Sequence, residues 1–240
     1  SPTDCFDTAY EACRLALRYM TPVVVLSDAY LANGSQPWRI PSQDSLPPID
    51  VRFAQPEDAD TFQPYKRDAN LARPWAVPGT PKLMHRVGGL EKEDGTGNVS
   101  YDPLNHQKMV ELRAAKVAKI AEELPPTEVH GAAEGDLLVL TWGSTYGAAT
   151  AAVRECLKDG DSVGHVHLRH LNPLPNDLEP ILRRYRRVLV PELNAGQLRW
   201  LIRAKFLIDA VGLNKIQGKP FTQSELLDGI RQNLEALRNE

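Results

Sequence analysis

The stretch D136LLVLTWGSTYGAATAAVREC156 decides the fold of this chain. Residues 136–142 form an almost continuous apolar run, the pattern of a strand that is buried on both faces. Gly143, Ser144 and Thr145 interrupt the run, and the small and apolar residues of 146–158 then recur at helical spacing. The stretch therefore predicts a buried strand, a tight turn and a helix in direct succession.

The same alternation continues to the end of the chain. The stretches 162–171 and 186–192 predict two more strands, and 178–185 and 196–211 predict helices. A capping box, Thr222 with Glu225 three residues later, predicts the start of a last helix. Because strands that alternate with helices form parallel sheets, the fold class is α/β with a mostly parallel sheet.

The first 28 residues predict one more helix and one more strand. Ser1 can cap a helix over residues 1–20, and Phe6, Tyr10, Cys13, Leu17 and Met20 form its apolar stripe. The run TPVVVLSD at 21–28 predicts a strand buried on both faces. One helix and one strand cannot make a sheet, so we expect the neighbouring strands to be cut away or supplied by another chain.

Residues 33–104 are rich in proline and glycine and show no sustained period. Aromatic and aliphatic residues are spread through this region, which a disordered linker would lack. We therefore expect an ordered, extended segment that packs against its own chain or a partner, with a hairpin near 83–100. Residues 105–123 predict a helix that Pro125 and Pro126 terminate.

The composition of the 240 residues narrows the class of function. A net charge of −3, with acids and bases interspersed, gives no electrostatic basis for binding nucleic acid or an anionic membrane. No apolar run approaches the roughly 20 residues that span a bilayer. The three cysteines, Cys5, Cys13 and Cys156, are too few and too scattered for a disulfide framework, so a cytoplasmic location is expected.

The turn Gly143–Thr145 is one candidate site. Ligands of open α/β sheets bind outside the carboxyl ends of the strands, and the free N–H groups of a following helix favour an anion. The alternative is that Gly143 only makes the turn and that a hydroxyl caps the helix. Neither G-x-G-x-x-G nor a Walker lysine is present, so the motif gives no support to nucleotide binding.

Three histidines, His165, His167 and His170, form a second candidate site. His165 and His167 are two residues apart on a predicted strand and therefore share a face, and three imidazoles can hold zinc. A histidine-based metallohydrolase is accordingly one alternative function. In the other interpretation these histidines only form hydrogen bonds at a sheet edge or an interface.

Four strings together resemble a known family: TPVVVLSDAYLANGSQPWRIP, GGLEKEDGTGNVSYDPLNHQKMV, LTWGSTYGA and LRHLNPLP. They are similar to the α subunits of 2-oxoacid:ferredoxin oxidoreductases, most of all the 2-oxoglutarate enzymes. The resemblance covers nearly the whole chain and implies the carboxyl-terminal part of such a subunit. It implies the end of a thiamine-diphosphate pyrimidine-type domain at 1–33, an extended linker at 34–125 and a transketolase C-terminal-like domain at 126–240.

The resemblance also implies an activity that this chain cannot perform alone. The family decarboxylates a 2-oxoacid on thiamine diphosphate, transfers the acyl group to coenzyme A and reduces ferredoxin through iron–sulfur chemistry. The family's Y-P-I-T-P substrate loop and its magnesium-binding G-D-G…N motif are missing from these residues. The implied partners are a β subunit and the remainder of the α subunit, in a homo-oligomer.

Few residue roles follow from the resemblance. Gly143, Ser144 and Thr145 would contact coenzyme A or another subunit, and Ser27 and Asp28 would line the β-subunit interface. No catalytic acid, base or nucleophile is assigned. A non-catalytic dimerisation or assembly module remains the alternative, supported by the aromatic-rich segment and the arginine-bearing amphipathic helices.

Overall fold

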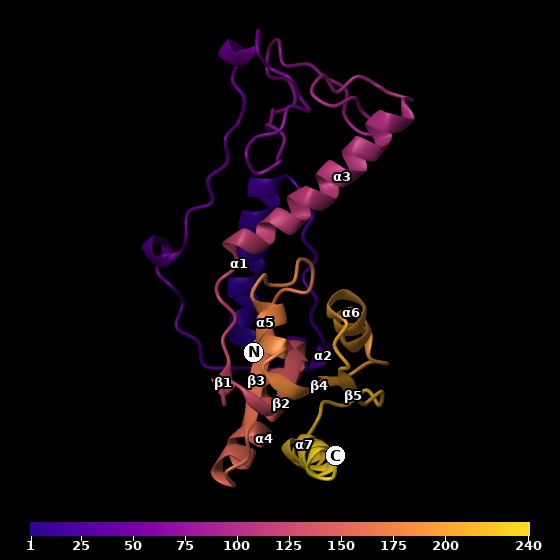
Figure 1. The fold of residues 1–240 in the computed structure, drawn as a ribbon. Coiled ribbons are helices and arrows are strands. Elements are labelled where there is room, and N and C mark those ends of the chain that lie inside the picture. The colour runs from indigo at the N-terminus through magenta and orange to yellow at the C-terminus, as the bar shows by residue number, and fades with distance from the viewer. The chain divides into compact units, whose positions relative to one another are not determined.

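The computed structural model describes residues 1–240, which form two compact units. One unit comprises residues 1–25 and 36–123, and the other comprises residues 26–35 and 124–240 (Figure 1). Both units therefore contain segments that are distant in the sequence. None of the helices combines the length and the hydropathy that crossing a membrane requires.

The second unit is built on a five-stranded sheet with the order β1-β3-β2-β4-β5. Its strands are β1 His130–Gly131, β2 Gly135–Trp142, β3 Val163–Leu168, β4 Tyr185–Glu192 and β5 Val211–Asn214. Strand β2 pairs in parallel with β3 and β4, β4 pairs in parallel with β5, and only the edge strand β1 is antiparallel. The predicted α/β fold with a mostly parallel sheet is confirmed.

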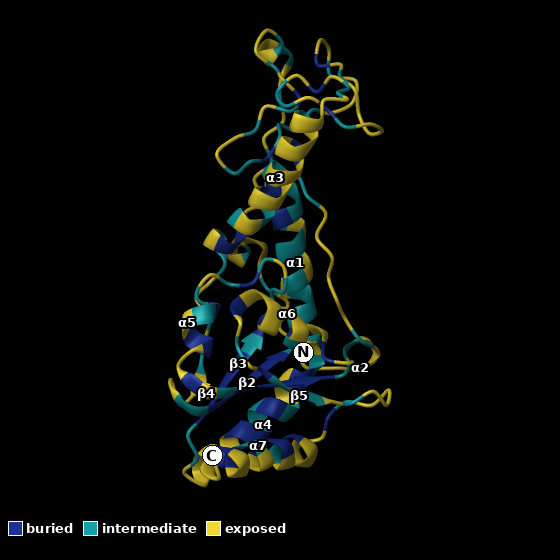
Figure 2. Cartoon of the chain, turned by 45° about the vertical axis from the view of Figure 1, so that its right-hand side comes forward, coloured by how far each residue is buried: buried dark blue, intermediate teal, exposed yellow.

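Helices cover both faces of this sheet, which explains the continuous apolar runs of its strands. Leu137 and Val139 of β2 pack in one cluster with α4 and α7, and Leu138 and Leu140 pack in another with α5 and α6. The bounds of these helices are α4 Tyr146–Lys158, α5 Leu178–Leu182, α6 Gln197–Phe206 and α7 Gln223–Arg238. Figure 2 shows the buried strands β2 and β4 above the helices α4 and α7.

The caps and ends of these helices agree only partly with the predictions. Both hydrogen bonds of the capping box between Thr222 and Glu225 are present at the start of α7. The helix predicted over 196–211 is too long, because α6 ends at Phe206 and the left-handed Leu207 (φ 54°) terminates it. The residues from 211 form β5 instead, since they pair with β4 and Val211 packs against a core cluster.

The first unit combines two long helices with irregular chain. Its helices are α1 Pro2–Tyr19 and α3 Pro103–Lys119, with 3₁₀ turns η1 Gln43–Ser45, η2 Pro56–Asp58 and η3 Ile120–Glu123. Ser1 accepts a hydrogen bond from the N–H of Asp4 at 3.3 Å, as the predicted cap requires. The predicted apolar stripe is partly wrong: Leu15 and Tyr19 are the buried residues of α1, and Cys13 is exposed.

Residues 36–102 are ordered against these helices, as predicted. The Trp75 indole donates to the carbonyl of Leu17 at 2.8 Å, and the Tyr10 hydroxyl donates to the carbonyl of Pro47 at 2.7 Å. The predicted hairpin is present between residues 91 and 100, closed by a bridge between Lys92 and Val99. Packing of this segment against a partner stays a prediction.

The strand predicted over residues 21–28 is absent. The segment is extended but pairs with no strand, and Val24 and Leu26 are 79% and 62% exposed. A strand exists only when neighbouring backbone supplies its hydrogen bonds, and these 240 residues supply none here. The short helix α2 Ala29–Ala32 follows directly.

Candidate functional site

The turn at the carboxyl end of β2 has the conformation that its glycine suggests. Gly143 lies in the left-handed region (φ 62°), where a side chain is strained, and it turns the chain through η4 Gly143–Thr145 into α4. The Thr145 hydroxyl donates to the carbonyl of Trp142 at 2.7 Å. It therefore closes the turn and does not cap the helix, because α4 has no side-chain cap. The capping interpretation is wrong for this residue.

The structure brings together the two groups of residues that the sequence marked as candidates. The Ser144 hydroxyl donates to Oδ2 of Asp28, which is 116 residues away in the chain. The other oxygen of Asp28 accepts the N–H of Leu31 at 3.0 Å and caps α2. Ser27 is exposed beside it. Since a carboxylate already meets this hydroxyl, a phosphate at Ser144 would be repelled. Contact with coenzyme A at this turn stays a prediction.

A buried acid at the end of the neighbouring strand β4 was not foreseen. The Glu192 side chain is fully buried and accepts the N–H groups of Leu198 at 2.8 Å and Arg199 at 3.1 Å. It also accepts the Trp142 indole N–H at 3.3 Å and the Asn194 amide at 3.2 Å. The carboxylate thus satisfies the first N–H groups of α6 and ties the end of β4 to the end of β2.

The position of this acid is where open α/β sheets bind ligands. The chain crosses from β3, on one side of β2, to β4 on the other, so the topological switch point lies between β2 and β4. In this chain Glu192 itself neutralises the positive end of α6 at that point. The signal in the sequence was an acid that ends an apolar strand, followed by an Asn-Ala-Gly loop and a helix.

Two of the predicted histidines share one hydroxyl. The Thr141 Oγ1 lies 2.7 Å from Nε2 of His165 and 2.8 Å from Nδ1 of His167. A hydroxyl has one proton, so at least one of the two imidazoles donates to it. Burial, and then the proximity of His167 and His130, lowers the pKa of His165 to about 3. His165 is therefore neutral at pH 7, and Tyr146 packs edge-on against His167 with 4.9 Å between ring centroids.

Hydrogen bonding of these histidines is confirmed, but not at a sheet edge, because β3 is paired on both sides. No group of three or more His, Cys, Asp or Glu side chains is placed so that it could hold a metal ion. A metallohydrolase needs about three protein ligands around one ion. The metallohydrolase alternative therefore has no geometric basis in this arrangement.

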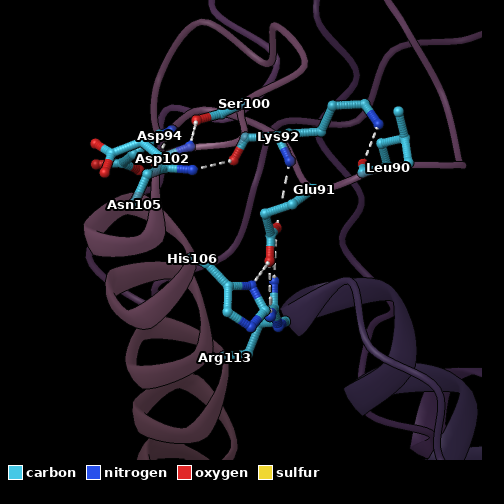
Figure 3. A network of polar contacts seen from close by, with 9 residues as sticks. All are labelled: Leu90, Glu91, Lys92, Asp94, Ser100, Asp102, Asn105, His106 and Arg113. Carbon is cyan, nitrogen blue, oxygen red and sulfur yellow. Dashed lines mark hydrogen bonds and ion pairs between the residues drawn. The ribbon is translucent and has the colours of Figure 1, made fainter.

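In the first unit, polar contacts anchor the hairpin to α3 (Figure 3). The Glu91 carboxylate accepts Arg113 at 3.2 and 3.3 Å and contacts Nδ1 of His106 at 2.8 Å. The hydrogen bond from Arg113, followed by that from His106, lowers the pKa of Glu91 to about 2. Asn105 accepts the N–H of Asp94 and donates to the carbonyl of residue 92. These contacts give the glycine-rich hairpin a structural role.

Comparison with known proteins finds relatives that cover nearly the whole chain. The family model for pyruvate flavodoxin/ferredoxin oxidoreductase, thiamine diphosphate-binding, matches residues 1–101. The chain is 49% identical over 236 residues to the 2-oxoglutarate oxidoreductase subunit KorA of Mycobacterium tuberculosis, covering 98% of the chain and 36% of that subunit. It is 28% identical to 2-oxoacid:ferredoxin oxidoreductase 1, subunit alpha, of Aeropyrum pernix, covering 98% of the chain and 37% of the relative.

A solved structure shares the fold. The chain superposes on 2-oxoglutarate:ferredoxin oxidoreductase from Magnetococcus marinus, solved with 2-oxoglutarate, coenzyme A and succinyl-CoA bound, with a TM-score of 0.85 and 30% identity. The match covers 92% of this chain and 39% of the other. The chain thus spans little more than a third of the proteins cited here. Over nearly its whole length the chain is similar to a segment of these oxidoreductase proteins.

Proposed function

We propose that this chain is a portion of the α subunit of a thiamine-diphosphate-dependent 2-oxoglutarate:ferredoxin oxidoreductase. The whole enzyme would decarboxylate the 2-oxoacid, transfer the acyl group to coenzyme A and pass the electrons to ferredoxin. One observation carries the proposal: 49% identity to a 2-oxoglutarate oxidoreductase subunit extends over 98% of the chain. The choice of 2-oxoglutarate rests on that likeness and on the Magnetococcus structure.

The residues of this chain do not fit the metal centres of such an enzyme. An iron–sulfur cluster needs about four thiolates, and this chain has three cysteines, one of them packed in the core on α4. No acidic or histidine cluster is placed to hold magnesium. We therefore assign the magnesium ion and the iron–sulfur cluster to residues outside these 240, and no chemical step to this chain alone.

The exposed apolar run supports the proposed partners. Val24 and Leu26 belong to the extended, unpaired segment 21–28 and are largely exposed. An apolar segment with free backbone groups pairs readily with another strand. In our proposal the remainder of the α subunit or the β subunit supplies that strand. Ser27 and Asp28 would line this contact, and the turn of Gly143–Thr145, joined to Asp28, would support it.

The internal division of the chain is also part of the proposal. We assign 1–33 to the end of a pyrimidine-type domain, 34–125 to an extended linker and 126–240 to a transketolase C-terminal-like domain. The free state of the cysteines agrees with the cytoplasmic location that we propose. A role in assembly, including formation of a homo-oligomer, is compatible with this function because the same exposed apolar run would form the contact between subunits.

A chimera tests the proposal. The chain replaces the matching segment of the mycobacterial KorA subunit, which is then purified with its partner subunits. We expect reduction of ferredoxin that requires both 2-oxoglutarate and coenzyme A. If the chimera assembles but fails to reduce ferredoxin with any 2-oxoacid, the proposed function is wrong.

Two substitutions at one position test the assembly role separately. Val24→Asp places a charge in the exposed run and should prevent co-purification of the partner subunits, because a buried unpaired carboxylate is strongly disfavoured. Val24→Ile keeps an apolar, β-branched side chain and should assemble normally. Normal assembly of the Val24→Asp chimera would show that the run is not covered by a partner.

A further inference from the structure

The first unit contains a cavity that none of the functions above uses. Residues of the segment 50–75, together with Leu17 and Arg18 of α1, line an open cavity of about 840 Å³. Sites for small molecules have volumes of roughly 300–1,000 Å³. Phe53 and Trp75, joined by a backbone bridge, give the cavity an aromatic lining. Its size and lining are those of a site for a molecule with a flat or apolar part.

Two arginines that line this cavity have no acidic partner. Arg67 donates from one terminal nitrogen to the carbonyl of Leu71 at 2.8 Å, but its Nε is buried and has no hydrogen-bond partner. Arg73 contacts the carbonyl of Pro64 at 3.4 Å, and its guanidinium lies 4.3 Å from the centre of the Tyr65 ring. Buried polar groups are normally paired. The guanidinium of Arg67 is therefore incompletely paired within the chain.

The acids of the lining are already engaged. Asp68 accepts the N–H groups of Asn70 at 2.8 Å and Ala72 at 2.9 Å, so its carboxylate holds a turn. Asp58 likewise accepts the N–H of Gln55 at 2.8 Å, and the third lining acid, Asp50, lies 3.9 Å from the exposed Arg52. These contacts leave the guanidinium groups of Arg67 and Arg73 without a carboxylate in hydrogen-bond range.

A further cation strengthens the positive field. Lys116 of α3 is buried and donates to the carbonyl of Met20 at 2.9 Å. Burial, followed by the charges of Arg67, Arg73 and Arg113, lowers its pKa to about 8. A bound anion would reduce the electrostatic repulsion between Lys116, Arg67 and Arg73.

We propose that this cavity binds a small anionic molecule through Arg67 and Arg73. Its phosphate or carboxylate group pairs with the guanidinium groups of Arg67 and Arg73. Its flat or apolar part lies against Phe53 and Trp75. This inference does not rest on the oxidoreductase function, because all the contacts belong to the first unit.

Titration of the whole chain with three probes tests the inference and identifies the chemistry. Inorganic pyrophosphate supplies phosphate alone, citrate supplies carboxylates, and ADP joins phosphates to a flat ring. Calorimetry gives the affinity and the stoichiometry. Because the chain has four tryptophans, quenching that a Trp75→Phe variant loses reports occupation beside Trp75. We expect one probe to bind at one site per chain, with ADP quenching most strongly if the aromatic lining is used.

Substitutions then identify the donors. Arg67→Gln and Arg73→Gln should each weaken binding by about 10- to 100-fold, the loss of one charge-assisted pair. Arg67→Lys keeps the charge but removes the planar guanidinium, and should also weaken binding. Arg86→Gln is the control, because that side chain is exposed and does not line the cavity, and it should change the affinity less than about twofold.

Two results would overturn the inference. One is that none of the three probes binds the folded chain. The other is that a probe binds with the same affinity to the Arg67→Gln and Arg73→Gln proteins. Circular dichroism of each variant shows whether it is folded. Because the two arginines are tested separately, the second variant still tests the inference if the first one does not fold.

Discussion

Replacing Glu192 should destabilise the second unit more than replacing any exposed acid of that unit. Its carboxylate is fully buried and accepts four hydrogen bonds, two of them from the first N–H groups of α6. Hydrogen bonds to a charged group contribute about 1.5–3 kcal/mol each, and a buried donor left without its acceptor carries a further penalty. The same carboxylate also interacts favourably with the positive end of the helix.

These contacts set the expected magnitudes. Glu192→Gln keeps the volume and one acceptor oxygen, but it can turn an amide N–H₂ towards the N–H of Arg199. We expect the free energy of unfolding of this variant to be lower by about 2–3 kcal/mol, because one charge-assisted hydrogen bond is lost and its donor is left unpaired. Glu192→Ala removes every acceptor and leaves a cavity, and should cost about 3–5 kcal/mol.

Urea unfolding followed by circular dichroism measures these losses as shifts of the midpoint at constant slope. The matched control is Glu179→Gln, a half-exposed helical acid paired with Arg183 at 2.7 Å, which should cost no more than about 0.5 kcal/mol. If Glu192→Gln unfolds within about 0.5 kcal/mol of the control, the carboxylate does not hold the start of α6 and the reasoning fails.

Three further outcomes are expected. Because burial lowers the pKa of His165 to about 3, protonation favours the unfolded chain. At pH values below about 6.5 the free energy of unfolding should therefore decrease, by at most about 1.4 kcal/mol per pH unit. In His165→Gln the free energy of unfolding should depend less steeply on pH. A methyl group on Gly164 would lie 2.7 Å from a backbone carbonyl oxygen, so Gly164→Ala should destabilise the fold by about 1–3 kcal/mol. A methyl group on Gly147 would meet no atom within 4 Å, so Gly147→Ala should stabilise α4 by about 0.5–1 kcal/mol. Equal melting temperatures of the two variants would contradict this. Burial raises the pKa of the Cys156 thiol to about 11, so a thiol reagent should label the exposed Cys13 in the native chain and Cys156 only after unfolding; rapid native labelling of both would contradict the packing.

Much of the second unit could be predicted from local pattern. The strand at 136–142, the helix at 146–158 and the box of Thr222 with Glu225 all agree with the structure. Each of these features depends on residues a few positions apart, because a helix and its caps are satisfied within one segment. The strand at 163–168 was also predicted, since a run buried on both faces has a distinct composition.

The failures concern segments whose conformation depends on distant partners. The run at 21–28 has the composition of a buried strand, yet it stays unpaired because no neighbouring strand lies in these residues. The helix predicted over 196–211 ends at residue 206, and residues 211–214 form β5 because β4 offers an open edge. Periodicity describes which side chains are apolar, but backbone pairing decides whether a strand forms.

The sequence by itself determined the α/β class, the order of most elements from residue 130 onwards and the resemblance to oxidoreductase α subunits. The tertiary structure alone decided how the candidate residues meet: Ser144 with Asp28, Thr141 with two histidines, and Glu192 with the start of α6. The physical reason is that a polar side chain finds its partner across strands and loops, where register and chain direction set the distance. No local pattern encodes that distance, so the contacts that define the sites became visible only in the folded chain.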